Sequence, residues 1–473
     1  MKKIIYIYGA PASGKTTFAK RFASAADARA VDLDACIEET AGRDIPSIFA
    51  EEGEETFREL ESSVLRRVSD EASRRAGTTV VSLGGGALLR GANRDFAESA
   101  GDVICLDTPA EKELARRLAS AGAAARPLGN KAKERAEHYA SFPRRIAAFF
   151  DLPGSLVAVG RSIAGTFLEG GKVVADANVA AVWRGLVPAP VAVVPSGEEH
   201  KTPHTVAFLW SAFAAAGISR RDTVSAVGGG VTGDLAGFAA ATWMRGIDWM
   251  NFPTTLLSMV DASTGGKTGC DLPEGKNLAG AFHSPRLVAI DADFLSTLDA
   301  GTLAQGRAEM IKHEIIGGLD AVTGAACLEP AGIAANLKVK IDIVREDPFE
   351  KTGRRALLNC GHTVAHAIEK ITRYGVSHGE AVAAGCVEEA RLAEREGLAS
   401  KGWADSLAER FAAENLPVSL PEGVAFDDLV PLMAGDKKRD GSAVSFALPC
   451  AWGDVRLVKF DLSGGRCRIV MEG

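Results

Sequence analysis

The chain has 473 residues, of which 47% are hydrophobic and 24% charged, with a formal net charge of -7. This length suggests about three domains of ordinary size in a globular protein. The acidic charge argues against a nucleic-acid-binding surface, although an acidic protein can carry a locally positive site for an anionic small substrate.

No hydrophobic run reaches the ~20 residues of a transmembrane helix, and no secretory signal is recognisable at the start of the chain. The eight cysteines are scattered without a CxxC pair, which favours reduced thiols over a disulfide framework or a cysteine-metal site. We therefore expect a cytoplasmic protein that acts on small molecules, with neither nucleic acid nor membrane as a partner.

Short β-branched runs alternate with alanine-rich helical stretches up to about residue 290, a pattern typical of parallel α/β units. Strands are expected at 3–8, 78–83, 102–106, 156–160, 172–175, 191–194 and 223–227. A helical segment is expected around 131–150, followed by a domain break near 151–154. From about residue 293 the segments 303–316, 331–346, 361–371, 379–396 and 402–414 predict helices. The predicted fold is α/β, with a phosphate-loop domain over 1–150, a second α/β domain over 151–292 and a mainly helical domain over 293–473.

The first predicted strand runs into a segment that matches the phosphate-loop pattern GxxxxGK[ST], namely Gly9-Ala10-Pro11-Ala12-Ser13-Gly14-Lys15-Thr16-Thr17. Backbone N–H groups of such a loop hold phosphate oxygens at a helix N-terminus, Lys15 adds positive charge, and the Thr16 hydroxyl suits Mg²⁺. A strand before and a helix after the loop favour a nucleotide site over a chance glycine-rich turn. The loop alone indicates an NTPase or a kinase without naming the substrate.

Polar residues that follow this loop in the sequence narrow the choice of substrate. In chain order they are Asp32 and Asp34 after the second strand, Arg58 on a helix, the triplet Gly84-Gly85-Gly86 after a strand, then Arg126 and Arg135. Singly, each has an ordinary interpretation, such as a solvated helix arginine or a turn. In this order behind a phosphate loop they resemble shikimate kinase, over residues 1 to about 150.

This resemblance implies ATP-dependent phosphorylation of shikimate with Mg²⁺ on Thr16 and Asp32 in the outer shell of the metal. Shikimate would contact Asp34, Arg58, Gly84, Gly85, Gly86 and Arg135, and ATP would contact Gly9, Ala12, Ser13, Gly14, Lys15, Thr16, Thr17 and Arg126. Lys15, Asp34 and Arg126 would be catalytic: the ammonium and guanidinium groups stabilise charge on the transferring phosphoryl group, and Asp34 accepts from ring hydroxyls of shikimate. The alanine-rich stretch 119–125 replaces an arginine that the family usually carries in its lid, and the last strand of the family and its adenine-side loop look trimmed. A degenerate nucleotide-binding regulator is therefore the alternative.

A second anion site is predicted where the strand at 223–227 runs into Gly228, Gly229 and Gly230, with Asp234 in the helix that follows. A strand, a glycine turn and a helix N-terminus suit a pyrophosphate. The pattern is not GxGxxG, so a plain turn is an equal alternative. Asp176, Asn178, Glu198 and Lys201 are polar candidates for the riboses and base of a dinucleotide.

The stretch from 244 to 277 combines glycines with short polar and basic residues, among them Arg245, Thr254, Thr255, Asp261, Lys267, Lys276 and Asn277. This composition favours a closed pocket for a multiply anionic ligand over a solvated loop. Further along, His362 and His366 have the i, i+4 spacing of one helix face, and His378 follows. Spacing alone nominates the first two as zinc ligands, but two ordinary helix histidines fit equally well.

Four motifs together resemble 3-dehydroquinate synthase, over about residues 154 to 473. They are Asp261-Ala262-Ser263-Thr264-Gly265-Gly266-Lys267, Ala308-Glu309-Met310-Ile311-Lys312, Leu358-Asn359-Cys360-Gly361-His362-Thr363 and His378-Gly379-Glu380-Ala381-Val382. The resemblance implies that Glu309, His362 and His378 bind Zn²⁺, or another divalent metal such as Co²⁺. It leaves His366 off the metal, as a substrate and proton-relay residue.

The resemblance also implies NAD⁺ as cofactor and a homodimer formed through the synthase part. Cofactor residues would be Asp176, Asn178, Glu198, Lys201, Gly228, Gly229, Gly230, Asp234, Thr254, Thr255, Lys267, Lys276, Phe294 and Thr297. Substrate residues would be Arg245, Asp261, Lys267, Lys276, Asn277, Lys312, Lys340, Arg355, Asn359, His366 and Lys437, with Lys267, Lys312 and His366 catalytic. Thr264, Asp271 and His283 replace the usual Val, Asn and Gln.

The implied reaction is cyclisation of 3-deoxy-D-arabino-heptulosonate 7-phosphate to 3-dehydroquinate with release of phosphate. The basic shell suits a ligand with carboxylate and phosphate groups. Another sugar-phosphate cyclase or a polyol dehydrogenase of the same superfamily is the alternative for this half. A dehydrogenase of small neutral substrates, however, does not need the lysines and arginines of the substrate set.

Overall fold

The computed structural model describes residues 3–109, 113, 116, 135–168, 171–320, 323–434, 439–440, 443–463 and 467–470. Two predicted site residues, Arg126 and Lys437, lie outside these ranges. Within them, none of the helices has the length and hydrophobicity needed to cross a bilayer.

The first part of the chain is an α/β unit whose strands lie in the order β2-β3-β1-β4-β5. Its elements are β1 (Lys3–Gly9), α1 (Lys15–Ala25), β2 (Arg29–Asp32), α2 (Leu33–Ala41), α3 (Ile45–Arg74), β3 (Thr78–Ser82), α4 (Gly91–Ala100), β4 (Asp102–Leu106), α7 (Ala136–Ala140) and β5 (Arg145–Leu152). The strands predicted at 3–8, 78–83 and 102–106 are confirmed as β1, β3 and β4.

Strand β5 corrects two expectations. The helix expected to reach residue 150 gives way to a strand from Arg145, so the first unit has a last strand where the sequence looked trimmed. Local sequence in this segment is compatible with a helix, but β5 pairs with β4 on one side and with β6 (Ser155–Arg161) on the other. Tertiary pairing therefore overrides local propensity here.

The next part of the chain extends the same sheet in the order β6-β13-β10-β9-β7-β8. Its elements after β6 are α8 (Ala164–Leu168), β7 (Lys172–Asp176), α9 (Ala177–Val182), β8 (Ala192–Val194), η1 (Glu198–His200), α10 (Pro203–Ala215), β9 (Thr223–Gly228), α11 (Gly230–Thr242), η2 (Trp243–Arg245), β10 (Asp248–Pro253), η3 (Ser258–Ala262), β11 (Lys267–Leu272), β12 (Gly275–Phe282), β13 (Leu287–Asp291) and η4 (Ala292–Thr297). The strands predicted at 156–160, 172–175, 191–194 and 223–227 are confirmed, whereas β10 to β13 were not predicted.

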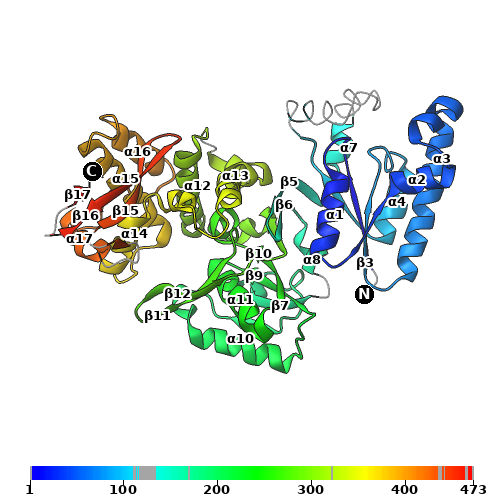
Figure 1. The fold of residues 1–473 in the computed structure, drawn as a ribbon. Coiled ribbons are helices and arrows are strands. Elements are labelled where there is room, and N and C mark those ends of the chain that lie inside the picture. The colour runs from blue at the N-terminus through cyan, green and yellow to red at the C-terminus, as the bar shows by residue number, and fades with distance from the viewer. Residues whose placement is uncertain are drawn as a thin grey trace.

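The last part is mainly helical, as predicted, and lies at the opposite end of the molecule from α1 to α4 (Figure 1). Its elements are α12 (Ala300–Gly317), η5 (Gly324–Leu328), α13 (Pro330–Glu346), η6 (Arg354–Asn359), α14 (His362–Ile371), α15 (His378–Arg395), α16 (Trp403–Ala412), α17 (Phe426–Ala434), β14 (Arg439–Asp440), β15 (Ala443–Ala451), β16 (Asp454–Asp461) and β17 (Arg468–Ile469). The four-stranded antiparallel sheet β14-β15-β16-β17 is an addition that the sequence did not predict.

The hairpin between β5 and β6 reverses the direction of the large sheet. β5 runs parallel to β4, β6 pairs antiparallel with β5, and β13 runs parallel to β6. The carboxyl ends of the strands, where ligands bind in α/β sheets, therefore lie at opposite edges on the two sides of the hairpin. A ligand site of the first unit and one of the second cannot share an edge of this sheet.

One hydrophobic core also joins the two units. Phe18 and Phe22 of α1, the helix behind the phosphate loop, are buried in the same cluster as apolar residues of β6, β13 and α13. The ring of Phe18 lies 5.3 Å from that of Phe149 in β5, and the ring of Phe22 lies 4.5 Å from that of Phe167 in α8. The second unit therefore covers one face of the phosphate-loop helix.

Candidate active sites

The phosphate loop places its oxygen donors where a magnesium nucleotide would bind. Thr16 Oγ1 donates to Asp32 Oδ2 at 3.0 Å and lies 3.2 Å from Ser82 Oγ, so these groups from α1, β2 and β3 meet at the carboxyl ends of the strands. Lys15 Nζ donates to the Ala10 carbonyl at 2.8 Å, across the loop. Hard oxygen ligands of this kind suit Mg²⁺.

The glycine triplet lies against the other residues predicted for shikimate. A Cβ on Gly84 would come within 2.8 Å of Asp34 Oδ1, and one on Gly86 within 2.6 Å of Arg58 Nη2. Arg58 Nη1 lies 2.5 Å from Glu61 Oε2, whose side chain is buried. The sequence prediction did not include Glu61, although it holds the guanidinium in place.

The segment of Arg135 closes the same side of the site. Arg135 precedes α7, and its carbonyl accepts from the Tyr139 backbone N–H at 3.1 Å. Tyr139 Oη donates to the Gly85 carbonyl at 2.7 Å, which ties α7 to the triplet. The structure thus gathers every described residue of the predicted shikimate set, whereas Arg126 falls outside the described residues.

The predicted dinucleotide residues lie at the opposite edge of the sheet. β7, β9 and β10 are parallel neighbours, and their carboxyl ends carry Asp176, the glycine turn and Thr254. Thr254 N–H donates to the Gly228 carbonyl at 2.9 Å. Asp176 caps α9 by accepting from the Asn178 and Val179 N–H groups.

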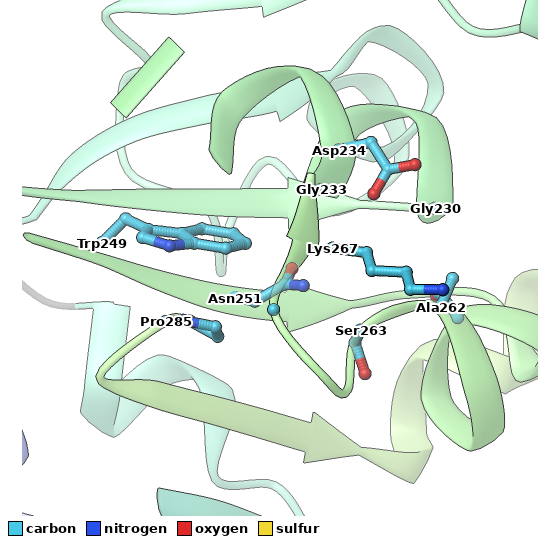
Figure 2. A pocket seen from close by; sticks show the side chains of 12 residues that line it. Gly230, Gly233, Asp234, Trp249, Asn251, Ala262, Ser263, Lys267 and Pro285 are labelled. Atoms are coloured by element: carbon cyan, nitrogen blue, oxygen red, sulfur yellow. The ribbon is translucent and has the colours of Figure 1, made fainter. Parts of the chain in front are cut away.

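A pocket of about 10 Å³, room for about one water, lies under the start of α11 (Figure 2). Its lining includes Gly229, Gly230, Asp234 and Lys267. Asp234 Oδ2 pairs with Lys201 Nζ at 2.6 Å, and that ammonium is buried. The N–H groups at the start of α11 therefore offer positive potential for a pyrophosphate, whereas Lys201 and Lys267 are each paired with a carboxylate.

Phe294 and Thr297 belong to η4, directly after β13, and thus lie at this same edge. Trp183 Nε1 donates to Thr297 Oγ1 at 3.3 Å, and the Trp183 ring meets the Phe294 ring edge-on, with centroids 5.1 Å apart. Both predicted cofactor residues therefore contact the side chain of Trp183, which the sequence prediction did not include.

Three residues from three helices form a compact donor cluster. Glu309 comes from the middle of α12, and His362 and His378 are the first residues of α14 and α15. Nε2 of His362 lies 3.6 Å, and Nε2 of His378 3.2 Å, from Glu309 Oε1. His366, whose ring centroid is 5.6 Å from that of His362, is not part of this cluster.

The donor cluster fits a divalent metal. His362 Nδ1 lies 3.1 Å from the Cys360 carbonyl and His378 Nδ1 3.3 Å from Glu369 Oε1, so both Nε2 atoms face Glu309. Burial lowers the pKa of His378, but its hydrogen bonds to Glu309 and Glu369 outweigh this and raise the pKa to about 9, so a metal that binds there displaces a proton. Burial and the nearby Lys312 charge lower the pKa of His362 to about 3, which keeps that imidazole neutral. Two imidazole nitrogens and a carboxylate are ligands that Zn²⁺ accepts, with a coordination position left open.

A buried charged cluster adjoins these donors. Lys340 Nζ from α13 lies 2.5 Å from Asp261 Oδ1, and Lys312 Nζ lies 3.6 Å from Asp261 Oδ2 and 2.5 Å from Glu309 Oε2. Burial raises the pKa of Asp261, but the charges of the two lysines outweigh it and hold the pKa well below its usual range. Two ammonium groups held this way can bind an anionic substrate.

The remaining predicted substrate residues are spread over several elements and are less closely grouped. Arg355 is buried and donates to the Gly265 and Pro348 carbonyls at 3.1 and 3.0 Å, beside the glycine loop of Lys267. Asn359 ends η6, next to the metal donors. Asn277 in β12 and Arg245 at the end of η2 are exposed, with positive φ angles of 53° and 68°, and Lys437 lies outside the described ranges.

Three further residues of this site were missed. Glu350 Oε2 pairs with Lys267 Nζ at 2.6 Å, and Glu369 contacts both His378 and Lys276. His313 is fully buried, and its Nε2 lies 3.9 Å from Asp261 Oδ1. None has a spacing that marks a site, because Lys267, Lys276 and Asp261 lie far away in the sequence; His378, nine residues after Glu369, is the exception.

Comparison with known proteins agrees with this geometry. Residues 11–150 match the shikimate kinase family, residues 191–305 the N-terminal and residues 306–439 the C-terminal domain of 3-dehydroquinate synthase. A 3-dehydroquinate synthase of Symbiobacterium thermophilum is 40% identical over 321 residues, 63% of this chain and 89% of the relative. That of a Synechococcus strain is 43% identical over 278 residues, covering 56% and 75%.

The chain belongs to the 3-dehydroquinate synthase family. A shikimate kinase domain precedes the synthase, so the chain is a bifunctional enzyme with a kinase part and a lyase part. Both resemblances found in the sequence are therefore confirmed.

Solved structures of sugar-phosphate cyclases share the fold of the synthase. A 2-deoxy-scyllo-inosose synthase complexed with carbaglucose-6-phosphate, NAD⁺ and Co²⁺ is 26% identical, covers 66% of this chain and 96% of that chain, and has a TM-score of 0.56. A 2-epi-5-epi-valiolone synthase from Streptomyces hygroscopicus, with NAD⁺ and Zn²⁺ bound, is 28% identical, covers 66% and 94%, and has a TM-score of 0.58.

Proposed function

We propose that the synthase part converts 3-deoxy-D-arabino-heptulosonate 7-phosphate into 3-dehydroquinate and phosphate, and that the kinase part transfers a phosphoryl group from ATP to the 3-hydroxyl of shikimate. The observation that carries the first reaction is the cluster of Glu309, His362 and His378 beside the buried Lys312–Asp261–Lys340 group. A metal site next to fixed positive charge suits a polyhydroxylated substrate with two anionic groups.

Bound Zn²⁺ would polarise a secondary hydroxyl and NAD⁺ would take up and return its hydride, while the residues of the chain bind and orient the substrate. Lys312, Lys340 and Arg355 supply positive charge for the carboxylate and phosphate. His366, one turn after His362, reaches the substrate without being a ligand and moves a proton. Glu350 holds the ammonium of Lys267 at the edge of this site.

In the kinase part, Lys15 would exchange its contact with the Ala10 carbonyl for a phosphate oxygen. Asp34 accepts from a ring hydroxyl of shikimate, and Arg58, braced by Glu61, pairs with the shikimate carboxylate. Thr16 and Asp32 would hold Mg²⁺, which neutralises charge on the phosphates. Arg126 is proposed for the same role from the sequence resemblance alone.

We further propose that the protein is cytoplasmic, forms a homodimer through its synthase part, and divides into units of 1–150, 151–292 and 293–473. Two alternatives compete. Another sugar-phosphate cyclase activity fits the likeness to the solved cyclases, but relatives 40–43% identical are 3-dehydroquinate synthases. A regulatory, non-catalytic kinase part is disfavoured by the assembled Lys15, Asp34 and Arg58 site.

Two assays test the proposal. Protein loaded with Zn²⁺ and NAD⁺ should release phosphate from the heptulosonate phosphate, and failure to do so would refute the synthase assignment. Lys15→Ala should abolish shikimate-dependent ADP formation while leaving phosphate release by the synthase intact, because the two sites lie at opposite edges of the sheet. Retained kinase activity in this variant would show that phosphoryl transfer occurs elsewhere.

The metal set has its own test. His378→Ala should lose bound zinc, whereas His366→Ala should keep the metal and turn over slowly. Equal loss of metal from the two variants would overturn the ligand assignment.

A further inference from the structure

A single buried carboxylate, Glu369, connects two parts of the synthase that are far apart in the sequence. It lies on α14, two turns after His362, and its side chain is 4% exposed. Its Oε1 atom lies 3.3 Å from His378 Nδ1 and 3.2 Å from Lys276 Nζ. One oxygen therefore contacts a residue of the proposed metal set and a residue of the proposed cofactor set.

On the metal side, Glu369 holds one nitrogen of an imidazole whose other nitrogen lies 3.2 Å from Glu309 Oε1. His378 begins α15 with its side chain 31% exposed, in contrast to the fully buried Glu309. A hydrogen bond from Nδ1 to Glu369 sets the tautomer and points Nε2 toward Glu309. Carboxylates that bind metal-ligating histidines in this way typically contribute about 10–100-fold to metal affinity.

On the cofactor side, Glu369 restrains a lysine on a hairpin outside the main sheet. Lys276 lies in β12, and its ammonium also sits 4.5 Å from the Tyr374 ring centroid and 3.9 Å from Glu198 Oε1. Glu198 in turn lies 3.9 Å from Lys201, which pairs with Asp234 of α11. A row of alternating charges thus runs from the metal donors to the pyrophosphate-binding turn.

We propose that Glu369 is a positioning residue that couples the metal site to the dinucleotide site. Metal binding fixes the His378 ring, the ring holds Glu369, and Glu369 holds Lys276 in the position that the dinucleotide needs. Each ligand therefore orders groups that the other uses, and the two bind with positive cooperativity. This inference rests on the proposed function for the roles of His378 and Lys276.

The test is a thermodynamic cycle on the full chain without substrate. The dissociation constant of Zn²⁺ is measured by competition with a chromophoric chelator, in the presence and absence of saturating NAD⁺. In the wild type, NAD⁺ should tighten Zn²⁺ binding at least about fivefold. Glu369→Gln should weaken Zn²⁺ binding about 10–100-fold. It should also bring the ratio of the Zn²⁺ dissociation constants measured without and with NAD⁺ to about 1.

Two further variants separate coupling from general damage. Lys276→Met should keep wild-type Zn²⁺ affinity in the absence of NAD⁺, but NAD⁺ should no longer tighten Zn²⁺ binding, so the ratio of the two dissociation constants should be about 1. This variant decides the question if Glu369→Gln does not fold. Glu380→Gln changes a carboxylate that caps the start of α15 without contacting His378 or Lys276, so it should keep the ratio.

A wild-type ratio of 1, or an unchanged ratio in both Glu369→Gln and Lys276→Met, would overturn the coupling. Enzyme that releases phosphate but binds the two ligands independently would refute the coupling alone. Coupled binding without phosphate release would instead refute the proposed reaction.

Discussion

Gly361→Ala tests how tightly the two helices that carry the proposed metal histidines are packed. Gly361 directly precedes His362, has a φ of 77° and donates its N–H to Glu389 of α15 at 2.8 Å. A Cβ at this position would lie 2.3 Å from Cys386 Sγ and 2.9 Å from the Cys386 backbone nitrogen. The added methyl group can be accommodated only if α14 moves away from α15.

Two effects set the magnitude. A non-glycine residue with left-handed backbone costs roughly 1–2 kcal/mol, and overpacking a filled core costs roughly 1–3 kcal/mol more. We therefore expect the free energy of unfolding to fall by about 2–5 kcal/mol in Gly361→Ala. Gly353→Ala is the matched control, since Gly353 has a φ of 81° but open space around it, and should show the backbone cost alone.

Urea unfolding of the metal-free variants, followed by fluorescence and circular dichroism, measures both costs. Because a shift of α14 displaces His362 relative to Glu309, Gly361→Ala should also bind Zn²⁺ more weakly, whereas Gly353→Ala should not. Equal destabilisation of the two variants, or wild-type Zn²⁺ affinity in Gly361→Ala, would refute the packing argument.

Three other changes give separate tests. Ala12→Gly should stabilise the kinase part by about 0.5–1 kcal/mol in urea unfolding, since Ala12 has a φ of 60° and glycine removes that strain; a loss of stability would contradict this. Phe22→Ala should lower the free energy of unfolding by about 3–5 kcal/mol and should shift the loss of both activities together to a lower urea concentration, because Phe22 packs on Phe167 across the shared core. Exposed Phe208→Ala should have little effect, and an earlier loss of the kinase activity alone would argue against one core. Burial lowers the pKa of His313 from 6.5 to about 4, so between these values the unfolded chain takes up a proton that the folded chain does not, and stability falls as pH falls. His313→Gln should remove up to about 3 kcal/mol of this acid sensitivity from the metal-free protein, and an unchanged pH profile of unfolding would contradict it.

Much of the kinase site could be predicted from the sequence because its chemistry is local. The phosphate loop lies between its own strand and helix within about fifteen residues, and the glycines and Lys15 act through the backbone that they themselves form. The helices from α12 to α16 were likewise readable, since their periodicity is a property of short segments. The proposed metal histidines required a resemblance as well, because His362 and His366 share a helix face while His378 comes from the next helix.

The tertiary structure decided what depends on pairing between distant segments. Residues 145–152 became a strand because β4 and β6 offer hydrogen-bonding edges, and the same hairpin set the two sites at opposite edges of one sheet. Glu350, Glu369 and His313 contact Lys267, Lys276 and Asp261, which lie tens of residues away in the sequence. The sequence by itself therefore indicated two chemistries, which the family matches confirm, and proposed residues for them. Only the folded chain decided how the two sites are oriented and which neighbouring residues hold their side chains in place, because long-range contacts leave no local pattern in a single sequence.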